Sequence, residues 1–491
     1  MKTCYMPPDA PTLMWSTRAI GYTTPAAVAD LIDNSIYAKA SQVFINFVSG
    51  EKSFVSILDN GEGMKQEELK EAMKYGSGNP WKDRAEEDLG RFGLGLKTAS
   101  LSQCRKLTVI SKSHDGIYGF CWDLDHVIKV KNWELLELES DDIVSTPQYH
   151  ELEKFEQGTL VVWQDLDKLC AGDEDKERGM ILKIREVEEH LAVTFHRFLQ
   201  GEPGLQKIQM YSNGVQIEAK DPFFIIRSDE MPSEKIAVTF EKNGMKKTDY
   251  VIVTPYILPF ADSLTQEEID KLGGKDGLVK NQGFYIYRNK RLIVAADWFR
   301  LARKTDLTKL CRVKVDLPNS MDEAWTLDVK KSMAIPPEIV LRNLKRIITP
   351  ILNTGKRKYR FRAKKESSET NMKVWMPGET RNGVIYSINR EYPIVKEIEK
   401  ELGNSKKLDV LFRLIEQNIP LNTIHSDFYD DKKFASEDMQ SAYENVISNL
   451  KMLLRELKPE DRIEEFGELM KIAPFSEYEI TYEELGDIDN G

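Results

Sequence analysis

The first 200 residues mix helical and strand-like patterns without the regular βα alternation of a doubly wound sheet. A helical pattern covers about 25–40, and two strand-like runs follow, QVFINFV (42–48) and FVSILD (54–59). Helical patterns return at 65–76 and 93–104. Three more strand-like runs end near residue 166, before a long helical pattern at 176–200. This irregular order predicts an α+β fold, a two-layer α/β sandwich.

The first of these helices carries a polar stripe. In AVADLIDNSIYA (27–38), the residues Asp30, Asp33, Asn34 and Tyr37 lie at i, i+3, i+4 and i+7, so they share one helix face. The stripe holds two acids and an amide but no lysine or arginine. A solvated helix face usually mixes charges, because like charges at this spacing repel one another. The stripe is therefore a candidate functional site.

A strand and a glycine turn form a second candidate. In LDNGEGM (58–64) the strand delivers Asp59 into a turn that contains Gly61 and Gly63. A buried carboxylate at a strand end can accept a hydrogen bond from the exocyclic amine of a base, and glycines let the backbone approach a planar ligand. An ordinary hairpin turn explains DNG equally well, so this segment alone leaves both interpretations open.

Two further glycine segments follow. In GRFGLGLKTAS (90–100), glycines precede Lys97 and a helical pattern, which suits phosphate binding by backbone N–H groups. The P-loop pattern GxxxxGK[ST] is absent and no βαβ unit surrounds the segment, so a flexible glycine loop remains the alternative. The last segment is Gly158-Thr159, which begins the strand-like run TLVVWQ and could be a plain strand start.

In this order, the four segments resemble the GHKL ATPases, the superfamily of gyrase, the heat-shock chaperone, histidine kinases and MutL. The MORC-like and MutL-like branch is the most similar, over about residues 15–200. A looser likeness to the transducer domain of gyrase and MutL covers 205–350. The resemblance implies a Bergerat-type ATP-binding domain, an α/β transducer-like domain and a mostly helical C-terminal region. The expected divisions are an N-terminal strap at 1–20, the ATP-binding domain at 21–203, the transducer-like domain at 204–353, a basic linker or arm at 354–384 and the helical region at 385–491.

The resemblance also implies ATP and Mg²⁺ as ligands. Asp30 matches the general base that activates the attacking water, although the family often has glutamate there. Asn34 matches the amide that holds Mg²⁺ against the phosphates, and Asp59 matches the residue that reads adenine, supported by Thr159. The absence of lysine and arginine from the stripe would then make sense, because Mg²⁺ and bound phosphates, rather than side chains, would meet it. The other expected nucleotide contacts are Gly61, Gly63, Met64, Gly93, Leu94, Gly95, Leu96 and Lys97.

Three features near this site are less specific. Residues 76–92 would form the ATP lid. Asp33 matches an acidic position beside the magnesium site, where a structural role and a catalytic role are both open. Tyr37 stands where many relatives have aspartate, and we assign it no role.

Two segments of the second domain resemble functional parts of the family. WTLDVKKSMAIPP (325–337) is similar to the segment whose lysine reaches the γ-phosphate. Strand alternation would place Lys331, rather than Lys330, on the inward face, while two solvated lysines at a strand end are the alternative. GFYIYRNKRLI (283–293) resembles a MORC-like strand that passes through a polar turn, and an exposed hairpin would explain it as well.

Charge and cysteine content set the expected location and partners. The net charge of −11 argues against a generally basic surface, yet KRKYRFRAKK (356–365) holds seven basic residues and no acid. This segment is either a DNA contact or a solvated linker. Five cysteines without a CxxC pair, and no apolar run of the roughly 18–20 residues that a membrane helix needs, predict a cytoplasmic protein without a membrane span.

The resemblance implies an ATP hydrolase that forms an ATP-dependent homodimer. Such a cycle would clamp or remodel DNA, in a restriction, phage-defence or repair-like system. A chaperone-like ATPase that acts on protein partners, contacted for example through the C-terminal helices, is the alternative from another class. An ATP-binding conformational switch with negligible turnover is a further alternative. A histidine kinase is excluded for want of a membrane span and a suitably placed histidine.

Overall fold

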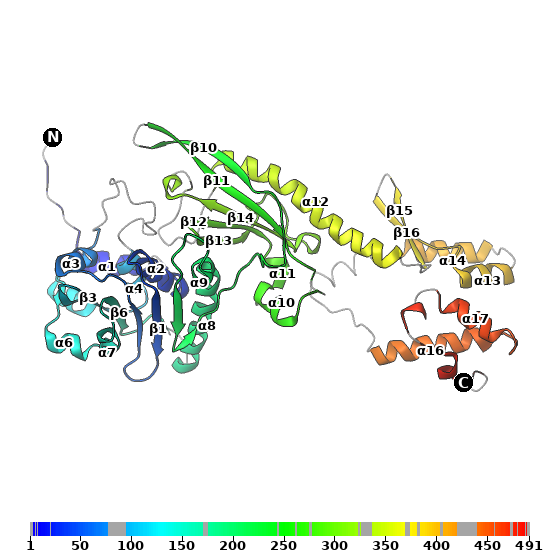
Figure 1. The fold of residues 1–491 in the computed structure, drawn as a ribbon, viewed down its shortest axis with the longest axis horizontal. Helices are drawn as coiled ribbons and strands as arrows, with labels where there is room; N and C mark the ends of the chain where they lie inside the picture. Colours follow the sequence, from blue (N-terminus) through cyan, green and yellow to red (C-terminus); the bar gives the residue numbers. More distant parts are fainter. Residues whose placement is uncertain are drawn as a thin grey trace. The chain divides into compact units, whose positions relative to one another are not determined.

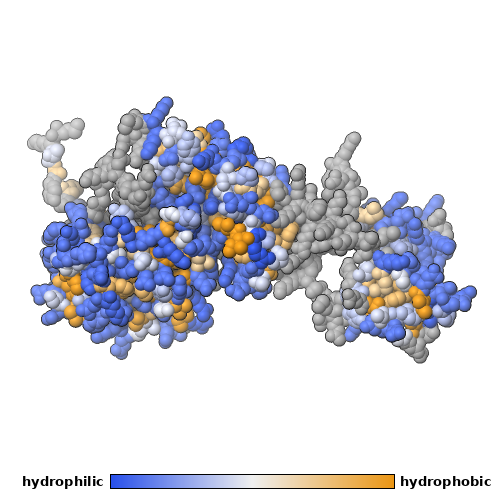
Figure 2. Space-filling view, viewed as in Figure 1, coloured by the Kyte–Doolittle hydropathy of each residue, from blue (hydrophilic) through white to orange (hydrophobic). Residues whose placement is uncertain are grey.

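The fold was determined as a computed structural model, and the chain divides into two compact units, Met1–Lys356 and Arg357–Gly491. Figure 1 shows their helices and strands, and Figure 2 shows hydrophilic side chains over much of the same face. In some helices and strands only the backbone is described, namely at 242, 245, 354–368, 377–380, 383–385, 439–442 and 477. The structure describes all residues except 1–2, 5, 7, 20, 77–94, 170–174, 243–244, 261–262, 274–276, 323–324, 326–335, 369–373, 381–382, 403–405, 420–438, 456, 472–474, 479, 487 and 489–491.

The first sheet has eight strands in the order β5-β4-β3-β6-β2-β1-β7-β8. β1 and β7 pair in parallel, and the other neighbouring strands are antiparallel. The mixed sheet with helices packed on it confirms the predicted α+β class. Its strands are β1 (Gln42–Val48), β2 (Phe54–Asp59), β3 (Lys106–Ser113), β4 (Gly116–Asp123), β5 (Leu136–Glu137), β6 (Gly158–Gln164), β7 (Gln209–Ser212) and β8 (Val215–Gln216).

Helices cover both faces of this sheet, because side chains alternate along its strands. Val161 and Trp163 of β6 belong to the main core, whereas Leu160 and Val162 belong to a smaller core on the opposite face. In the main core, α2 packs against both α4 and α8. The helices of the main core include α2 (Thr24–Tyr37), α4 (Gly95–Leu101) and α8 (Lys176–Thr194); the smaller core includes α6 (Ser140–Ser145) and α7 (Tyr149–Glu153). The other helices of this domain also bury residues in the main core: α1 (Ala10–Arg18), α3 (Gln66–Met73), α5 (Leu124–Val130) and α9 (His196–Gln200).

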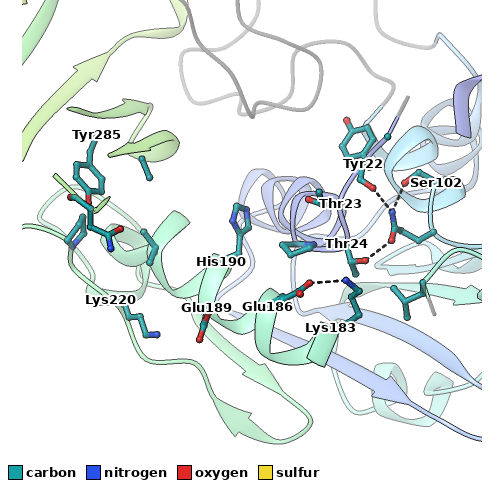
Figure 3. Close-up of a pocket in the computed structure, with 18 of the residues that line it drawn as sticks. Tyr22, Thr23, Thr24, Ser102, Lys183, Glu186, Glu189, His190, Lys220 and Tyr285 are labelled. Carbon is teal, nitrogen blue, oxygen red and sulfur yellow. Dashed lines mark hydrogen bonds and ion pairs between the residues drawn. The ribbon is translucent and has the colours of Figure 1, made fainter. Parts of the chain in front are cut away.

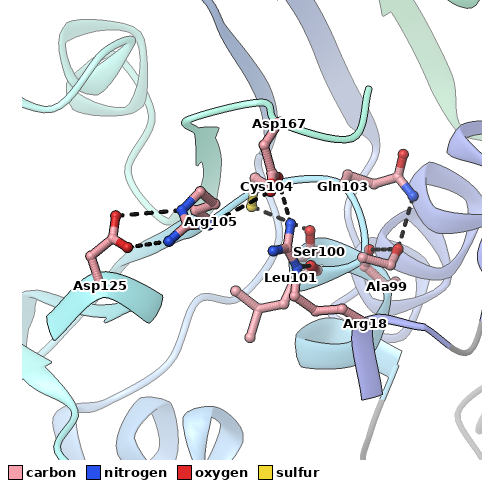
Figure 4. Close-up of polar contacts among 10 residues, drawn as sticks. Arg18, Ala99, Ser100, Leu101, Gln103, Cys104, Arg105, Asp125 and Asp167 are labelled. Atoms are coloured by element: carbon pink, nitrogen blue, oxygen red, sulfur yellow. Dashed lines mark hydrogen bonds and ion pairs between the residues drawn. The ribbon is translucent and has the colours of Figure 1, made fainter. Parts of the chain in front are cut away.

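The N-terminal helix α1 is fastened to its own domain (Figure 4). Arg18 at its end is buried, and its Nε donates to the carbonyl oxygen of Leu101, at 2.6 Å, while its guanidinium pairs with Asp167. Arg105, the next cation in this network, pairs with Asp125. Removing Arg18 would leave a buried carbonyl without its donor, so α1 and α4 are held together by a specific polar contact. The role of residues 1–20 as an N-terminal strap stays a prediction.

The second sheet has the strand order β10-β11-β14-β12-β13, and β9 pairs with β11. One face is covered by α12, whose Val340, Leu344 and Ile348 are buried against the strands. Its strands are β9 (Asp229–Glu230), β10 (Glu234–Lys242), β11 (Met245–Ile257), β12 (Gly283–Arg288), β13 (Arg291–Asp297) and β14 (Cys311–Leu317). Its helices are α10 (Gln266–Gly273), α11 (Gly277–Lys280) and α12 (Glu338–Ser368), with single 3-10 turns at Asp306–Thr308 and Asn319–Met321.

The other face of the second sheet meets α8 and α9 of the first domain. Tyr287 of β12 is fully buried there, and its hydroxyl lies 2.8 Å from Nε2 of His196. Arg197 reaches across the same interface to Asp316. This aromatic and charged interface joins the two α/β domains into one unit. The aromatic cluster consists of Phe223, Tyr256, Tyr285 and Tyr287, with Leu292, Ala296 and Val193.

Three expectations about segments differ from the structure. We expected the first domain to end at residue 203, but β7 and β8 extend its sheet to Gln216, because β7 pairs with β1. The spacing of apolar residues at 297–304 predicts a helix, but the chain forms turns there, with Phe299 and Arg300 at positive φ. The basic segment 356–365, expected to be a linker or an arm, continues α12.

The second unit has its own core, as the mostly helical expectation requires, together with one hairpin. Leu450 and Leu454 of α16 are fully buried in it. Its elements are β15 (Trp375–Thr380), β16 (Gly383–Ile388), α13 (Pro393–Glu401), α14 (Lys406–Gln417), α16 (Met439–Arg455) and α17 (Arg462–Leu469), with 3-10 turns at Phe475–Glu477 and Tyr482–Leu485. Among the residues that the structure describes, no helix combines the length and the apolar character required to traverse a membrane.

Candidate functional site

The polar stripe of α2 runs from a buried end to an exposed end. Thr23 caps this helix and Pro25 lies in its first turn, so the helix begins where capping rules predict. Asp30 and Asp33 are buried, with exposed fractions of 3% and 1%, whereas Asn34 is exposed. Tyr37, at the end of the stripe, is 59% exposed. The stripe therefore divides into two enclosed carboxylates and an amide that solutes can reach.

Asp30 is held by groups from outside α2. The hydroxyl of Tyr22 donates a hydrogen bond to Oδ2 of Asp30, at 2.9 Å. A Cβ atom on Gly95 would lie 3.5 Å from the same oxygen, so the start of α4 passes directly beside the carboxylate. The structure thus brings two of the predicted site residues, Asp30 and Gly95, together.

Arg291 supplies the cation that the stripe lacks in the sequence. Its Nε donates to Oδ1 of Asp33 at 2.8 Å, and its Nη2 lies 3.7 Å from Oδ1 of Asp30. Arg291 belongs to β13 of the second sheet and is 258 residues away from Asp33 in the chain. We expected only bound metal and phosphates to compensate the stripe; a protein side chain does so in part.

Asp59 lies at the end of β2 in a buried pocket of hydrogen-bond donors. The hydroxyl of Ser35 donates to its Oδ2 at 2.8 Å, and the backbone N–H of Gly61 donates to its Oδ1 at 2.9 Å. Burial nevertheless raises the pKa of the Asp59 carboxyl above its usual range. Ser35 follows Asn34 on α2, so the same helix carries the stripe and orients Asp59.

Backbone segments around Asp59 pack so closely against one another that three glycine positions have no room for a side chain. Gly63 has a φ of +66°, and a Cβ there would lie 2.0 Å from the carbonyl oxygen of Lys112. A Cβ on Gly61 would lie 2.7 Å from the carbonyl oxygen of Ala38. A Cβ on Gly158 would lie 2.2 Å from the carbonyl oxygen of Asp59. These glycines bring the loop after β2 and the start of β6 against one another beside the carboxylate.

Two other predicted residues lie in the same corner. Thr159 is opposite Asp59 in the β2–β6 pairing, and its hydroxyl lies 2.9 Å from that of Ser111. The backbone N–H of Met64 donates to the same Ser111 hydroxyl, at 2.8 Å. Ser111 therefore connects the glycine turn with β6.

Lys97 is buried between α4 and α3. Its ammonium donates to the carbonyl oxygen of Ala72, at 2.8 Å. Burial lowers the pKa of this lysine to about 8. Leu96, beside it, packs against the main core. Contact between Lys97 and a phosphate stays a prediction.

Several expected residues lie outside the described part of the chain. These are Gly93, Leu94, Lys330, Lys331 and the expected lid except Gly76.

Some residues of this site were not predicted. Ser35 stands inside the motif that carried the resemblance, so its contact with Asp59 could have been inferred from the helical spacing. Tyr22, Ser111 and Arg291 have no local pattern that marks them, because their contacts arise from the packing of distant segments.

A cavity of about 860 Å³ lies behind the start of α2 (Figure 3). Its lining includes Tyr22, Thr24 and Gln103, and none of Asp30, Asn34 or Asp59 lines it. Gln103 accepts a hydrogen bond from Thr24 and donates one to the carbonyl oxygen of Tyr22, at 2.8 and 3.2 Å. These contacts support the loop that carries Tyr22.

The helix with its acid-acid-amide stripe and the glycine turn beside a buried aspartate resemble the nucleotide site of the GHKL type. In agreement, residues 22–159 match the family described as histidine kinase-, DNA gyrase B- and HSP90-like ATPase. This match confirms the resemblance recognised in the sequence.

Similar curated proteins come from the MutL branch of this superfamily. The DNA mismatch repair protein MutL of Pseudothermotoga lettingae is 30% identical over 188 residues, which cover 37% of this chain and 30% of that protein. MutL of Thermosipho melanesiensis is 23% identical over 232 residues, which cover 46% of this chain and 38% of that protein. The chain thus spans about a third of the length of these two relatives. The comparisons support ATP binding and general ATPase character for the matched domain.

Proposed function

We propose that this domain binds ATP and hydrolyses it with Asp30 as the general base. The buried carboxylate of Asp59, enclosed by glycines at positions 61, 63 and 158, is the observation that carries the proposal. A carboxylate can accept a hydrogen bond from the exocyclic amine of adenine, and the glycines let neighbouring backbone segments close around it. Ser35 and Gly61 fix the carboxylate before the base arrives.

The residues around α2 also fit a magnesium nucleotide. Asn34 is exposed one turn beyond Asp30, and an amide oxygen is a suitable ligand for Mg²⁺, which usually completes its shell with phosphate oxygens and water. We assign Asn34 to hold this ion, which would neutralise phosphate charge. The segment from Gly93 to Lys97 is proposed to contact the phosphates.

The hydrolytic step assigned to Asp30 is general-base catalysis. Its carboxylate takes a proton from a water molecule while the water oxygen attacks the γ-phosphorus, and the bond between that phosphorus and the β–γ bridging oxygen breaks to release ADP. Tyr22 holds one oxygen of Asp30, so the carboxylate does not turn freely. We further propose that Lys331 stabilises the developing charge on the phosphates.

Turnover measurements test this assignment. We expect the wild type to hydrolyse ATP, and the variants Asp30→Ala and Asn34→Ala to lose at least about a hundredfold in kcat, within the usual range for a general base. The Asp30→Ala variant should still bind ADP. Unchanged turnover in both variants would refute the proposed site.

For the whole protein, we propose an ATP-driven cycle of lid closure and homodimer formation that acts on DNA. The similar proteins named above are DNA mismatch repair proteins, which supports a DNA-related role. A role in restriction or phage defence is a narrower version of the same proposal. DNA binding through 356–365 should weaken steeply with salt, because it would release counterions from the phosphates. Sizing the full chain with ADP and with a non-hydrolysable ATP analogue, each with and without DNA, tests both parts; a monomer in every condition would contradict dimerisation.

One observation favours the alternative of protein partners. Helix α14 exposes a stripe of apolar side chains, Val410, Leu411, Leu414 and Ile415, each at least 42% exposed. Residues at this spacing share one helix face, and such faces often mark protein contacts. A chaperone-like ATPase or a nucleotide switch would use this face without DNA. Absence of salt-sensitive DNA binding, together with loss of a protein complex in Leu411→Glu, would support it.

A further inference from the structure

The base Asp30 and its neighbour Asp33 share one buried guanidinium, which comes from the second sheet. All three side chains are at most 3% exposed. Arg291 donates to Asp33 at 2.8 Å and lies 3.7 Å from the nearer oxygen of Asp30. The other oxygen of Asp30 accepts the hydrogen bond from Tyr22. Each oxygen of the base therefore faces a different group from outside its own helix.

The hairpin that carries Arg291 fixes the position of the guanidinium. Asn289 and Lys290 at its tip have φ values of +46° and +68°, as a two-residue type I′ turn requires. Arg291 is the first residue after the turn, and its guanidinium carbon lies 5.7 Å from the ring centre of Phe195, which is fully buried. Its Nη1 also donates to the backbone carbonyl of Leu292, at 3.2 Å. A turn, a ring and a backbone acceptor therefore hold the cation in one place.

We propose that Arg291 is a positioning residue for hydrolysis, through which the second α/β domain holds the carboxylate of Asp30 in its reactive orientation. This inference rests on the proposed function of Asp30. Two carboxylates one helical turn apart repel each other, and one shared cation removes that repulsion while fixing both. Because Arg291 lies on β13, hydrolysis is efficient only while the second sheet stays packed against α2, α8 and α9.

A purely structural ion pair would not need this arrangement. An ion pair with Asp33 alone would neutralise Arg291. The guanidinium also lies near Asp30, which is the proposed base, so it can act on the reactive group as well. The two roles are separable by experiment, since a structural pair affects folding and nucleotide binding, while a positioning residue affects kcat at unchanged ADP affinity.

The test uses full-length variants at position 291. We expect Arg291→Met to lower kcat by about 30- to 100-fold, part of what a general base contributes, with the ADP dissociation constant within about twofold of the wild type. Arg291→Lys should retain more activity than Arg291→Met, because an ammonium keeps the charge but not the fork that spans two carboxylates. Equal kcat values for these two variants, or a wild-type kcat in Arg291→Met, would overturn the proposal.

Two matched variants separate positioning from loosening of the interface. Arg197→Met removes another buried arginine that joins α9 to the second sheet, through Asp316; its other ion-pair partner among the described residues is Glu202. We expect it to lower the melting temperature but to keep kcat within about threefold, whereas general loosening would lower kcat as much as Arg291→Met does. The second variant, Asp33→Asn, keeps an acceptor oxygen for Arg291 but removes one carboxylate charge, and its own kcat is the reference for the double variant. If adding Asp33→Asn restores turnover to Arg291→Met, Arg291 merely neutralises Asp33 and the proposal fails.

The outcome also distinguishes this inference from the proposed function. If wild-type turnover is absent or does not depend on Asp30, the proposed function fails whatever the variants at 291 do. If turnover depends on Asp30 and Arg291→Met keeps its full kcat, only the present inference fails. If Arg291→Met does not fold, the Arg291→Lys variant and the Arg291→Met/Asp33→Asn pair decide the question, and ADP binding shows whether their sites are intact.

Discussion

Replacing Asp59 by asparagine should separate nucleotide recognition from stability, because the two depend on this carboxylate in opposite ways. The side chain is 6% exposed, and it accepts hydrogen bonds from the Ser35 hydroxyl and the Gly61 N–H. Asparagine has nearly the same shape. Its oxygen can still accept from Gly61, and its amide group can donate to the Ser35 oxygen, because a hydroxyl rotates to accept as well as donate.

The magnitude follows from the charge. A hydrogen bond to a charged group contributes about 1.5–3 kcal/mol, so losing the carboxylate acceptor for adenine should weaken ADP binding by about 10- to 150-fold. Stability should not fall with it. Burial raises the pKa of Asp59, so the ionised form destabilises the folded state at neutral pH, and stability declines as the pH rises from the ordinary carboxyl pKa through the raised one. The substitution Asp59→Asn removes this decline.

Both quantities can be measured on one preparation of Asp59→Asn. Calorimetric titration with ADP and with GDP gives the affinity and the preference for adenine, and urea unfolding at pH 4.5 and 7 gives the stability. We expect weaker ADP binding, a reduced preference over GDP and a free energy of unfolding at pH 7 at least equal to that of the wild type. Wild-type ADP affinity would refute the adenine contact, and a loss of stability at pH 7 would refute the electrostatic reasoning.

Three further changes have defined outcomes. Gly63→Ala should destabilise the protein by more than the about 1–2 kcal/mol that a positive φ costs, because its Cβ would also lie 2.0 Å from a carbonyl oxygen. Gly204→Ala is the control in thermal unfolding, since Gly204 has a φ of +84° but no atom within reach of an added Cβ. Because burial lowers the pKa of Lys97 to about 8, its charge is lost above that pH, so ATP affinity should fall about tenfold between pH 7 and 9. Lys97→Met should show no such fall, and an equal fall in both proteins would contradict a phosphate contact. Burial also lowers the pKa of His196 to about 4, so as the pH falls this histidine is protonated in the unfolded chain before it is protonated in the folded one. The free energy of unfolding should therefore fall by up to about 3 kcal/mol from pH 7 to 4. Urea unfolding of His196→Gln should show a clearly smaller fall.

The elements of the first domain were predictable where a local pattern decides the structure. The runs 42–48 and 54–59 are strands at those residues, because their side chains alternate between two buried faces of one sheet. The glycine turn was predictable because only glycine fits at positions 61 and 63. The helix expected at 297–304 failed because the spacing of apolar residues suits a helix, while Phe299 and Arg300 adopt positive φ in the turn after β13.

Contacts between distant segments explain what the sequence could not predict. No local pattern indicates the partner of β7, whose parallel pairing with β1 places it in the first sheet. The same limit applies to the surroundings of Lys97, which no local pattern indicates. Its burial against α3 and its bond to Ala72 depend on how α3 and α4 pack.

The polar stripe of α2 shows why charge compensation must be sought in the whole fold. In the sequence, the stripe has two acids and no cation, which suggested that a bound metal ion and phosphates are its partners. The structure supplies one guanidinium for Asp30 and Asp33, so the three side chains together keep one negative charge in a buried place. That remaining charge lies beside Gly95 and one turn before the exposed Asn34, on the side where we propose that Mg²⁺ and the phosphates bind. A lysine or arginine on α2 itself, in addition to Arg291, would cancel this charge and compete with the metal ion. This is a physical reason for the absence of such residues from α2.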